Sequence, residues 1–338
     1  MLARRVGLQL TYDSVDISTD IQTHLINWTY TDNLSGQADD LQINLEDRGQ
    51  LWSGPWFPDE GATLRAKIIR ENWEQDGQKD ELSFGAFEID EVEPSGPPSA
   101  VTIKAISVPE SSSLRGENKN RAWEKTKLSV ISEDIASGAG LELFFDTDDD
   151  PEYDRIEQTE QSDLAFLQNA CNDAGLALKV SDAQVIIFDE AKYEQQDPVD
   201  TIVKGQARIK RYRARTTLSG LYKSCRVDYH DTDKKEGIKY EFTPPNPPKT
   251  GRVLVVNERV KSVAEAERLA KKKLREANKD GMIFSLTIMG DIKYLAGLTV
   301  NLSGWGKSDG KYIITQAVHG QQSGYEVKLE LRKCLEGY

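Results

Sequence analysis

Residues 85–107 read GAFEIDEVEPSGPPSAVTIKAIS, and this stretch decides the fold class. On both sides of the breaker PSGPPS, apolar and polar residues alternate with a period of two, which is typical of half-buried β-strands. The breaker is rich in proline and glycine, which end strands and form turns. The stretch therefore predicts two strands, 83–93 and 100–108, joined by a short connection.

The residues before this stretch continue the same pattern. Strand-like runs occur at 6–18, 26–32, 38–47 and 62–70, and short turn segments separate them. Six short strands with a period of two predict a small β-barrel or sandwich, which we expect to occupy residues 1–112.

The next part of the chain, residues 113–200, has a different character. It contains 21 acidic and 8 basic residues, so it alone carries a charge equal to the net −13 of the whole chain. Helices are predicted at 127–140 and at 162–175, the second with Ser162 as N-cap and Gly175 as stop. A hairpin is predicted around Ser181-Asp182, so this part is expected to be an α+β middle domain.

Residues 201–338 return to alternating strands. Runs at 207–216, 222–231, 238–243 and 310–320 are strand-like, and residues 324–333, GYEVKLELRK, place Tyr325, Val327 and Leu329 on one face. One helix is predicted at 262–280, opening with a capping box between Ser262 and Glu265 and presenting Val263 among its inward residues. The chain is therefore predicted to be mixed α+β and mostly β, with two tube-like β domains flanking the middle domain.

Composition excludes several classes of protein. Three widely spaced cysteines suggest neither a disulfide framework nor a zinc site, which fits a reducing cytosol. No apolar run is long enough for a membrane span, and the N-terminus lacks the features of a secretory signal. The negative charge argues against specific binding of nucleic acid through its phosphates.

No motif points to a catalytic, cofactor or metal site. Residues 301–308, NLSGWGKS, resemble a phosphate loop, but they lie between predicted strands, so the glycines are interpreted as hairpin turn residues. Residues 146–157, DTDDDPEYDRIE, space their acids like an EF-hand, but Pro151 stands where the loop needs glycine. With a strand expected before it and an irregular segment after it, this stretch is interpreted as a solvated acidic loop.

Two stretches are candidate interaction surfaces. Residues 51–61 place Trp52, Trp56 and Phe57 in a loop rich in proline and glycine; these aromatics either form a local core or anchor a protein interface. The strand at 208–215 is strongly basic and is expected to pair with acidic neighbours, including those of another subunit. Its cations are Arg208, Lys210, Arg211, Arg213 and Arg215.

The order of several segments resembles the phage late control D family, the baseplate hub of contractile phage tails and related injection systems such as R-type bacteriocins. The segments are 31–48, 85–107, 121–136, 158–180, 185–189, 265–274 and 310–331, which together extend over nearly the whole chain. The resemblance implies a homotrimer in which two tube-like β domains per chain form a pseudo-hexameric ring. That ring adapts the sixfold tail tube to the threefold central spike.

The resemblance also implies partners and a location. The expected partners are further copies of the chain, a separate central spike protein, the tail tube protein or tube initiator, baseplate wedge or sheath-associated proteins, and the tape measure protein. The expected location is a phage tail or bacteriocin baseplate after synthesis in the bacterial cytoplasm. Two alternatives stay open from the residues alone: a peptidoglycan-degrading tail hydrolase, for which no catalytic signature is found, and a carbohydrate- or receptor-binding β module.

Overall fold

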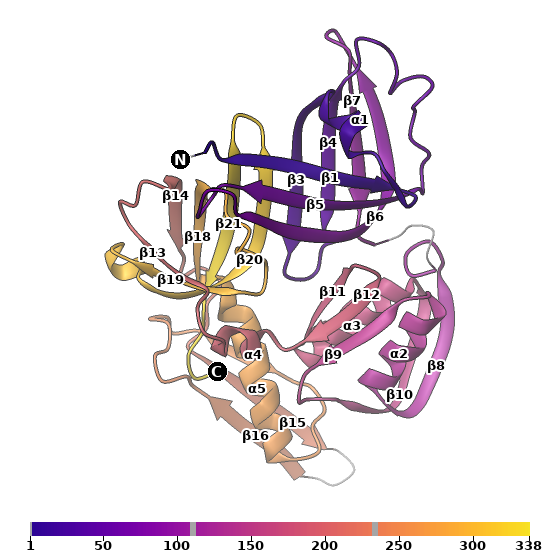
Figure 1. Cartoon of the computed structure of the whole chain (residues 1–338). Coiled ribbons are helices and arrows are strands. Elements are labelled where there is room, and N and C mark those ends of the chain that lie inside the picture. Colours follow the sequence, from indigo (N-terminus) through magenta and orange to yellow (C-terminus); the bar gives the residue numbers. More distant parts are fainter. Residues whose placement is uncertain (1, 109–112, 232–235) are drawn as a thin grey trace. The chain divides into compact units, whose positions relative to one another are not determined.

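The computed structural model describes residues 2–108, 113–231 and 236–338. Over these ranges strands dominate and α-helices are interspersed among them, which confirms the predicted mixed α+β, mostly β class (Figure 1). The chain folds into two compact units. The first comprises Met1–Glu190, Thr287–Ala296 and Gln316–Leu329, and the second Ala191–Leu286, Gly297–Thr315 and Glu330–Tyr338.

The first unit begins with an antiparallel β module that also contains a short helix. Its hydrogen-bonded strand order is β3-β4-β7-β6-β5-β1-β2. On the edge of β3 that does not face β4, β3 pairs with β20. The bounds are β1 (Arg5–Tyr12), β2 (Val15–Asp16), α1 (Ser18–Gln22), β3 (Leu25–Asn33), β4 (Asp40–Glu46), β5 (Thr63–Glu71), β6 (Lys79–Ser95) and β7 (Ala100–Ile106).

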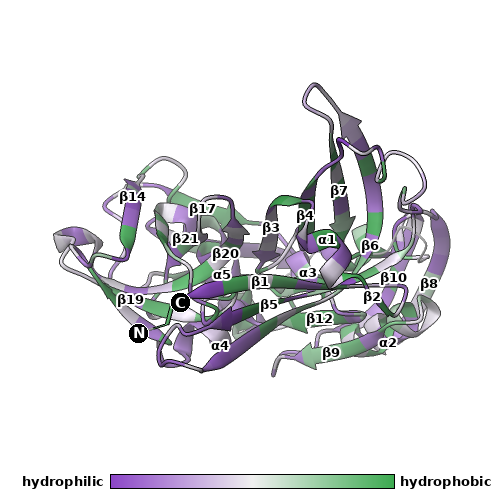
Figure 2. Cartoon of the chain, turned by 45° about the horizontal axis from the view of Figure 1, so that its top comes forward, coloured by the Kyte–Doolittle hydropathy of each residue, from purple (hydrophilic) through white to green (hydrophobic). Residues whose placement is uncertain are grey.

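Alternation along these strands produces the core. On β7, for example, Val101, Ile103 and Ala105 are buried while the intervening residues are only partly so. Figure 2 shows the same alternation as hydrophilic and hydrophobic bands along the strands. β6 and β7 pair antiparallel with Ser95 opposite Ala100, so the strand–breaker–strand prediction is confirmed.

The rest of the first unit is an acidic module in which two helices pack on small sheets. Its elements are β8 (Lys119–Lys127), α2 (Leu128–Gly138), β9 (Glu142–Asp146), β10 (Glu152–Gln161), α3 (Asp163–Ala174), β11 (Ala177–Ser181) and β12 (Gln184–Phe188). β10 pairs with β8, and β11, β12 and β9 form a second sheet. One core of aliphatic and aromatic side chains from both helices and the β11–β12 hairpin holds the module together.

The helix caps of this module agree with the sequence. Ser162 accepts a hydrogen bond from the backbone of Ala165, and Gly175 adopts a left-handed conformation with φ of 67°. Glycine suits that conformation because it has no Cβ to clash. The turn at Asp182 and Ala183 likewise has φ values of 47° and 60°, as a two-residue hairpin turn requires.

The second unit contains β13, β14 and β19 with parts of β18, β20 and β21, and a helix-covered module. The sheet of these strands has β14, β18, β21 and β20 in that order, with β19 beside β20 and β13 beside β19. The helix-covered module packs α5 on the strands β16, β15 and β17, around the valines and alanines of a separate core. The bounds are α4 (Glu190–Gln195), β13 (Asp200–Val203), β14 (Ile209–Thr216), β15 (Ser224–Asp231), β16 (Glu236–Phe242), β17 (Val253–Val256), α5 (Val263–Asn278), β18 (Met282–Met289), β19 (Thr299–Ser303), β20 (Gly310–Gln321) and β21 (Tyr325–Lys333).

The predicted helix at 262–280 is present, with one correction. Ser262 accepts a hydrogen bond from the Glu265 backbone at 3.2 Å, which confirms half of the capping box, while the Glu265 side chain accepts from the Lys261 backbone. Val263, predicted to point inward, is exposed. At the first helical position its side chain precedes the buried stripe, which begins at Ala266 and continues through Ala270 and Leu274.

The phosphate-loop-like stretch is a turn between two strands. β19 ends at Ser303, β20 begins at Gly310, and the two strands pair antiparallel. Gly304 and Gly306 have φ values of 87° and 67°, which favour glycine. In the part of the chain that the structure describes, no helix has both the length and the apolar character needed to cross a bilayer.

Candidate functional site

The aromatic loop between β4 and β5 is organised by Asp47. Its carboxylate accepts hydrogen bonds from the Trp52 backbone at 2.9 Å and from the Ser53 backbone at 3.0 Å, and also from the Ser53 hydroxyl. Burial favours the neutral acid, but these hydrogen bonds outweigh it and lower the pKa of Asp47. One carboxylate at the end of β4 therefore fixes the start of the loop.

The three aromatic residues of this loop have different environments. Trp52 is 5% exposed and packs edge-to-face against Trp56, with 5.4 Å between ring centroids. Trp56 and Phe57 are 44% and 43% exposed. Trp52 therefore belongs to the core of the β module, whereas Trp56 and Phe57 present aromatic surface to solvent.

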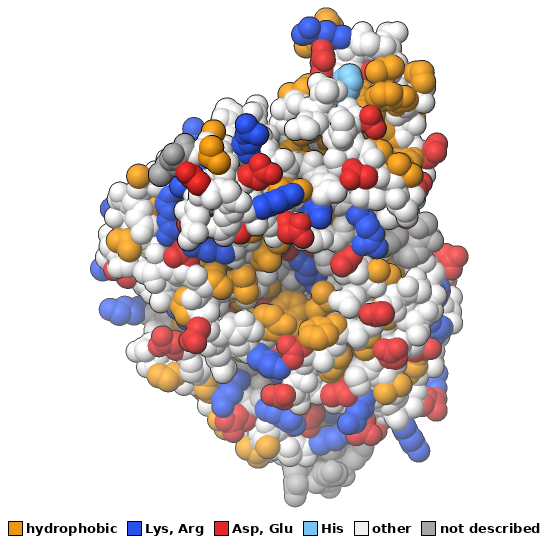
Figure 3. Space-filling model, in the orientation of Figure 1, with side chains coloured by type: hydrophobic (Ala, Val, Ile, Leu, Met, Phe, Trp, Pro, Cys, Tyr) orange, Lys and Arg blue, Asp and Glu red, His pale blue; other side chains and the backbone are white. Residues whose placement is uncertain are grey.

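A pocket opens beside this loop. We call it the aromatic pocket; its volume is about 470 Å³. Hydrophobic side chains gather over the loop, at the upper right of Figure 3. The walls are mostly apolar, and two carboxylates, Asp20 and Asp59, also line it. The apolar lining consists of Ile17, Ile21, Ile43, Trp52, Trp56, Phe57, Pro58, Leu64, Ile89 and Ile103.

The basic strand is β14, and it is exposed along almost its whole length. It stands at the end of the strand order of its sheet. Arg208, just before the strand, pairs with Asp200 at 2.8 Å. Within the described residues, Arg211, Arg213 and Arg215 form no ion pair. Cations on an edge strand discourage unspecific strand pairing and remain available to an acidic partner.

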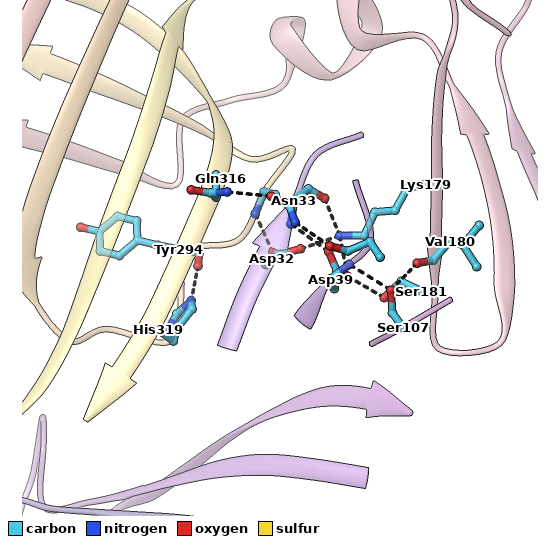
Figure 4. Close-up of polar contacts among 12 residues, drawn as sticks. Asp32, Asn33, Asp39, Ser107, Lys179, Val180, Ser181, Tyr294, Gln316 and His319 are labelled. Atoms are coloured by element: carbon cyan, nitrogen blue, oxygen red, sulfur yellow. Dashed lines mark hydrogen bonds and ion pairs between the residues drawn. The ribbon is translucent and has the colours of Figure 1, made fainter. Parts of the chain in front are cut away.

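A buried polar cluster joins the β module to the acidic module, both of which lie in the first unit. We call Asp32, Asp39 and Lys179 the linking cluster. Lys179 Nζ lies 2.5 Å from Asp32 Oδ1 and 3.0 Å from Asp39 Oδ2, and it also donates to the Asn33 carbonyl at 2.8 Å. Figure 4 shows Lys179 reaching from β11 toward the two carboxylates.

Neighbouring hydrogen bonds complete this contact. Asp39 accepts from the Asn33 backbone at 2.8 Å and from the Ser181 hydroxyl at 2.9 Å. Ser107 donates to the Val180 carbonyl at 2.8 Å. Because side chains alternate along β11, Lys179 and Ser181 face the β module while Leu178 and Val180 enter the core of the acidic module.

The charges of the linking cluster do not balance, because two carboxylates share one cation. Burial raises the pKa of Asp39 to about 6, although Lys179 opposes the shift. Burial disfavours the charged form of Lys179, but the two carboxylates outweigh it and raise the pKa of Lys179. The linking cluster was not predicted from the sequence. Its only local signal is the pair of adjacent aspartates, Asp39 and Asp40, at the start of a strand.

Other reactive side chains have structural surroundings. Burial raises the pKa of Cys171 to about 12, so its thiol is protonated in the helix core. His319 is buried, with ring nitrogens 2.7 Å from the Tyr325 hydroxyl and 2.8 Å from the Tyr294 carbonyl (Figure 4 shows the contact to Tyr294). Burial lowers the pKa of His319. Among the described residues, no three His, Cys, Asp or Glu side chains are placed to hold a metal ion.

The acidic stretch 146–157 is more ordered than the sequence predicts. β9 ends at Asp146, and the residues after Pro151 form β10 instead of the expected irregular segment. β10 pairs antiparallel with β8, and its Tyr153 and Ile156 pack against the core of the acidic module. Arg155 on β10 also lies 2.6 Å from Glu124 on β8. Asp150 caps α2, accepting hydrogen bonds from the Ser129 backbone at 3.0 Å and hydroxyl at 2.7 Å.

Sequence relatives of this chain include two phage proteins described as probable baseplate hub proteins. No family model matches the chain. A probable baseplate hub protein of Escherichia phage P2 is 31% identical over 181 residues, which cover 53% of this chain. The match spans 44% of that relative, so it extends over less than half of the relative's length. The resemblance to phage baseplate hub proteins found in the sequence is thereby confirmed.

Solved structures with the same fold cover nearly the whole chain. A tail protein from Neisseria meningitidis MC58 superposes with a TM-score of 0.72 at 13% identity, covering 97% of this chain and 96% of its own. An E. coli protein described as a component of the type VI secretion system, with structural similarity to the T4 tail proteins gp27 and gp5, gives a TM-score of 0.57 at 12% identity. It covers 100% of this chain and 79% of its own.

Proposed function

We propose that this chain is the structural hub of a contractile-tail baseplate. The observation that carries the proposal is the combination of a sequence relative named a probable baseplate hub protein with a tail-protein fold along almost the full chain. A contractile phage tail and a tail-like bacteriocin would use such a hub in the same way.

The proposed hub acts as a homotrimer. Three copies, each with two β regions, would supply six positions around a ring and so join a sixfold tube to a threefold spike. The exposed edge strand β14 supports self-association, because an unpaired edge in a free chain is a surface that a neighbouring copy can cover. The aromatic loop adds an apolar surface of the kind that anchors protein interfaces.

The proposed partners are the central spike, the tube protein or tube initiator, baseplate wedge or sheath-associated proteins, and the tape measure protein. The proposed role involves assembly and no catalysis. The negative net charge supports passage of DNA without tight binding, since such binding requires clustered cations that displace counterions.

Light scattering tests this proposal directly. The chain of 37.9 kDa should give about three times that mass, alone at high concentration or together with its spike. Electron microscopy of the complex should then show a threefold ring. A chain that stays monomeric at all concentrations and in the presence of the spike contradicts the proposed function.

A further inference from the structure

The aromatic pocket carries two exposed carboxylates at its rim. Asp20 and Asp59 line it, and neither forms an ion pair within the described residues. The same pocket is lined by apolar surface that includes the exposed rings of Trp56 and Phe57. The pocket thus suits an apolar side chain that is accompanied by positive charge.

The end of β14 carries the opposite charge to the rim of the aromatic pocket. Arg211, Arg213 and Arg215 alternate along β14, so they share one face of the strand. Leu218 follows three residues after Arg215, in the turn beyond the strand, and is 57% exposed. This leucine and the neighbouring arginines provide the apolar anchor and the cations that the pocket lacks.

Resting on the proposed homotrimer, we infer that the aromatic pocket of one copy receives the end of β14 from a second copy. Leu218 enters the pocket, and Arg213 and Arg215 pair with Asp20 and Asp59 at its rim. Because the two surfaces differ, the contact is head-to-tail, which is the type of contact that closes three copies into a ring.

Charge complementarity selects a second copy as the occupant. The pocket rim is acidic and the end of β14 is basic, and over the ranges that the structure describes neither set of charges is paired within the single chain. An apolar core with a charged rim is also the usual anatomy of a protein interface. The rim charges chiefly speed association and set how the two copies are oriented. Burial of Leu218 against Trp56 and Phe57 slows dissociation.

A charge-swap experiment tests the contact. One variant carries Asp20→Lys and Asp59→Lys, a second carries Arg213→Glu and Arg215→Glu, and a third carries all four changes. Each half-swap should weaken trimer formation roughly tenfold or more, because like charges then face each other across the interface. The full swap should restore it. Sedimentation of a concentration series measures each association constant.

The matched control is Glu133→Lys with Arg259→Glu, which reverses two exposed charges that belong neither to the pocket lining nor to β14. It should trimerise like the parent chain. Leu218→Asp should weaken the trimer without lowering the melting temperature of the monomer at low concentration, because Leu218 is exposed in the single chain.

The outcomes separate this contact from the proposed function. A parent chain that never trimerises overturns the proposed function itself. If the parent trimerises and the half-swaps trimerise equally well, or if the full swap fails to restore association, the contact is wrong while the hub stands. Half-swaps that trimerise normally but lose the spike or tube protein overturn the second copy as occupant and assign the pocket to that partner.

Discussion

Lys179 Nζ lies 3.0 Å from Asp39 Oδ2, and this ion pair connects the acidic module to the β module. Lys179 comes from β11, and Asp39 directly precedes β4. Both side chains are largely buried, so neither charge is hydrated as it would be at the surface. The stability of this contact therefore depends on every member of the linking cluster.

Replacing Lys179 by methionine should be strongly destabilising. The substitution leaves the carboxylates of Asp32 and Asp39 buried without their cation, and we expect a loss of about 3 to 5 kcal/mol in unfolding free energy. Urea denaturation measures this loss. Lys104→Met is the matched control, because Lys104 pairs with Glu91 at the surface, where such pairs contribute about 0 to 1 kcal/mol. Equal losses for the two variants would show that Lys179 is not the buried counter-charge.

Asp39 should make stability depend on pH in an unusual direction. Burial raises its pKa to about 6 in the folded chain, above the value of roughly 3.9 for an unfolded aspartate. The folded state thus binds the proton of Asp39 more tightly than the unfolded state does. The contribution of Asp39 to the free energy of unfolding is therefore full below about pH 3.9 and is lost as the pH rises through about 6. We expect Asp39→Asn to cost more at about pH 4.5 than at about pH 7.5. Denaturation curves across this range that run parallel for both chains would contradict the raised pKa.

The two tryptophans of the aromatic loop should respond differently to truncation. Trp52→Ala removes a core side chain, so we expect a loss of about 3 to 5 kcal/mol and a lower melting temperature. Trp56→Ala should change the melting temperature of the monomer little, because its ring is 44% exposed, but it should weaken trimer formation. Calorimetry and light scattering on both variants make the comparison. If the melting temperature falls equally for both, Trp56 is a folding residue and no interface anchor.

Glu194 should stabilise the second unit through two arginines. Its carboxylate lies 2.7 Å from Arg275 and 2.9 Å from Arg332, and the Glu194 and Arg332 side chains are almost fully buried. Glu194→Gln leaves both guanidinium groups without this counter-charge, and we expect a loss of roughly 3 kcal/mol or more. Glu276→Gln is the control, since Glu276 is exposed and pairs with Lys279 on the helix surface. A cost for Glu194→Gln no larger than that of the control would contradict the role of this cluster.

Some of the fold could be predicted because its signals are local. The alternation in 85–107, the Ser162 cap and the Gly175 stop each depend on residues a few positions apart, and all three appear as predicted. Short or charged elements escaped prediction, such as β13, and β10 with its acidic residues. β10 is a strand because it pairs with β8 and packs Tyr153 and Ile156 on the core, and no neighbouring residue in the sequence signals that partner.

The candidate surfaces were also only partly predictable. The sequence singles out Trp52, Trp56 and Phe57 together, but a turn rich in proline and glycine does not reveal which ring is buried. The position of Asp47 and the packing of Trp52 against His24, beside β3, decide that. Arg332 illustrates the same limit, because alternation along β21 places it on the polar face, while the structure buries it against Glu194.

The sequence by itself determined the strands, the main helices, the acidic middle segment and the resemblance to baseplate hub proteins. These features could be predicted because periodicity, helix caps and local charge depend on residues that are close together in the chain. Only the tertiary structure decided the linking cluster, the aromatic pocket and the burial of Arg332 and Trp52. These features arise where segments far apart in the chain exclude water from one another, and the free energy of a charge or a ring depends on that exclusion.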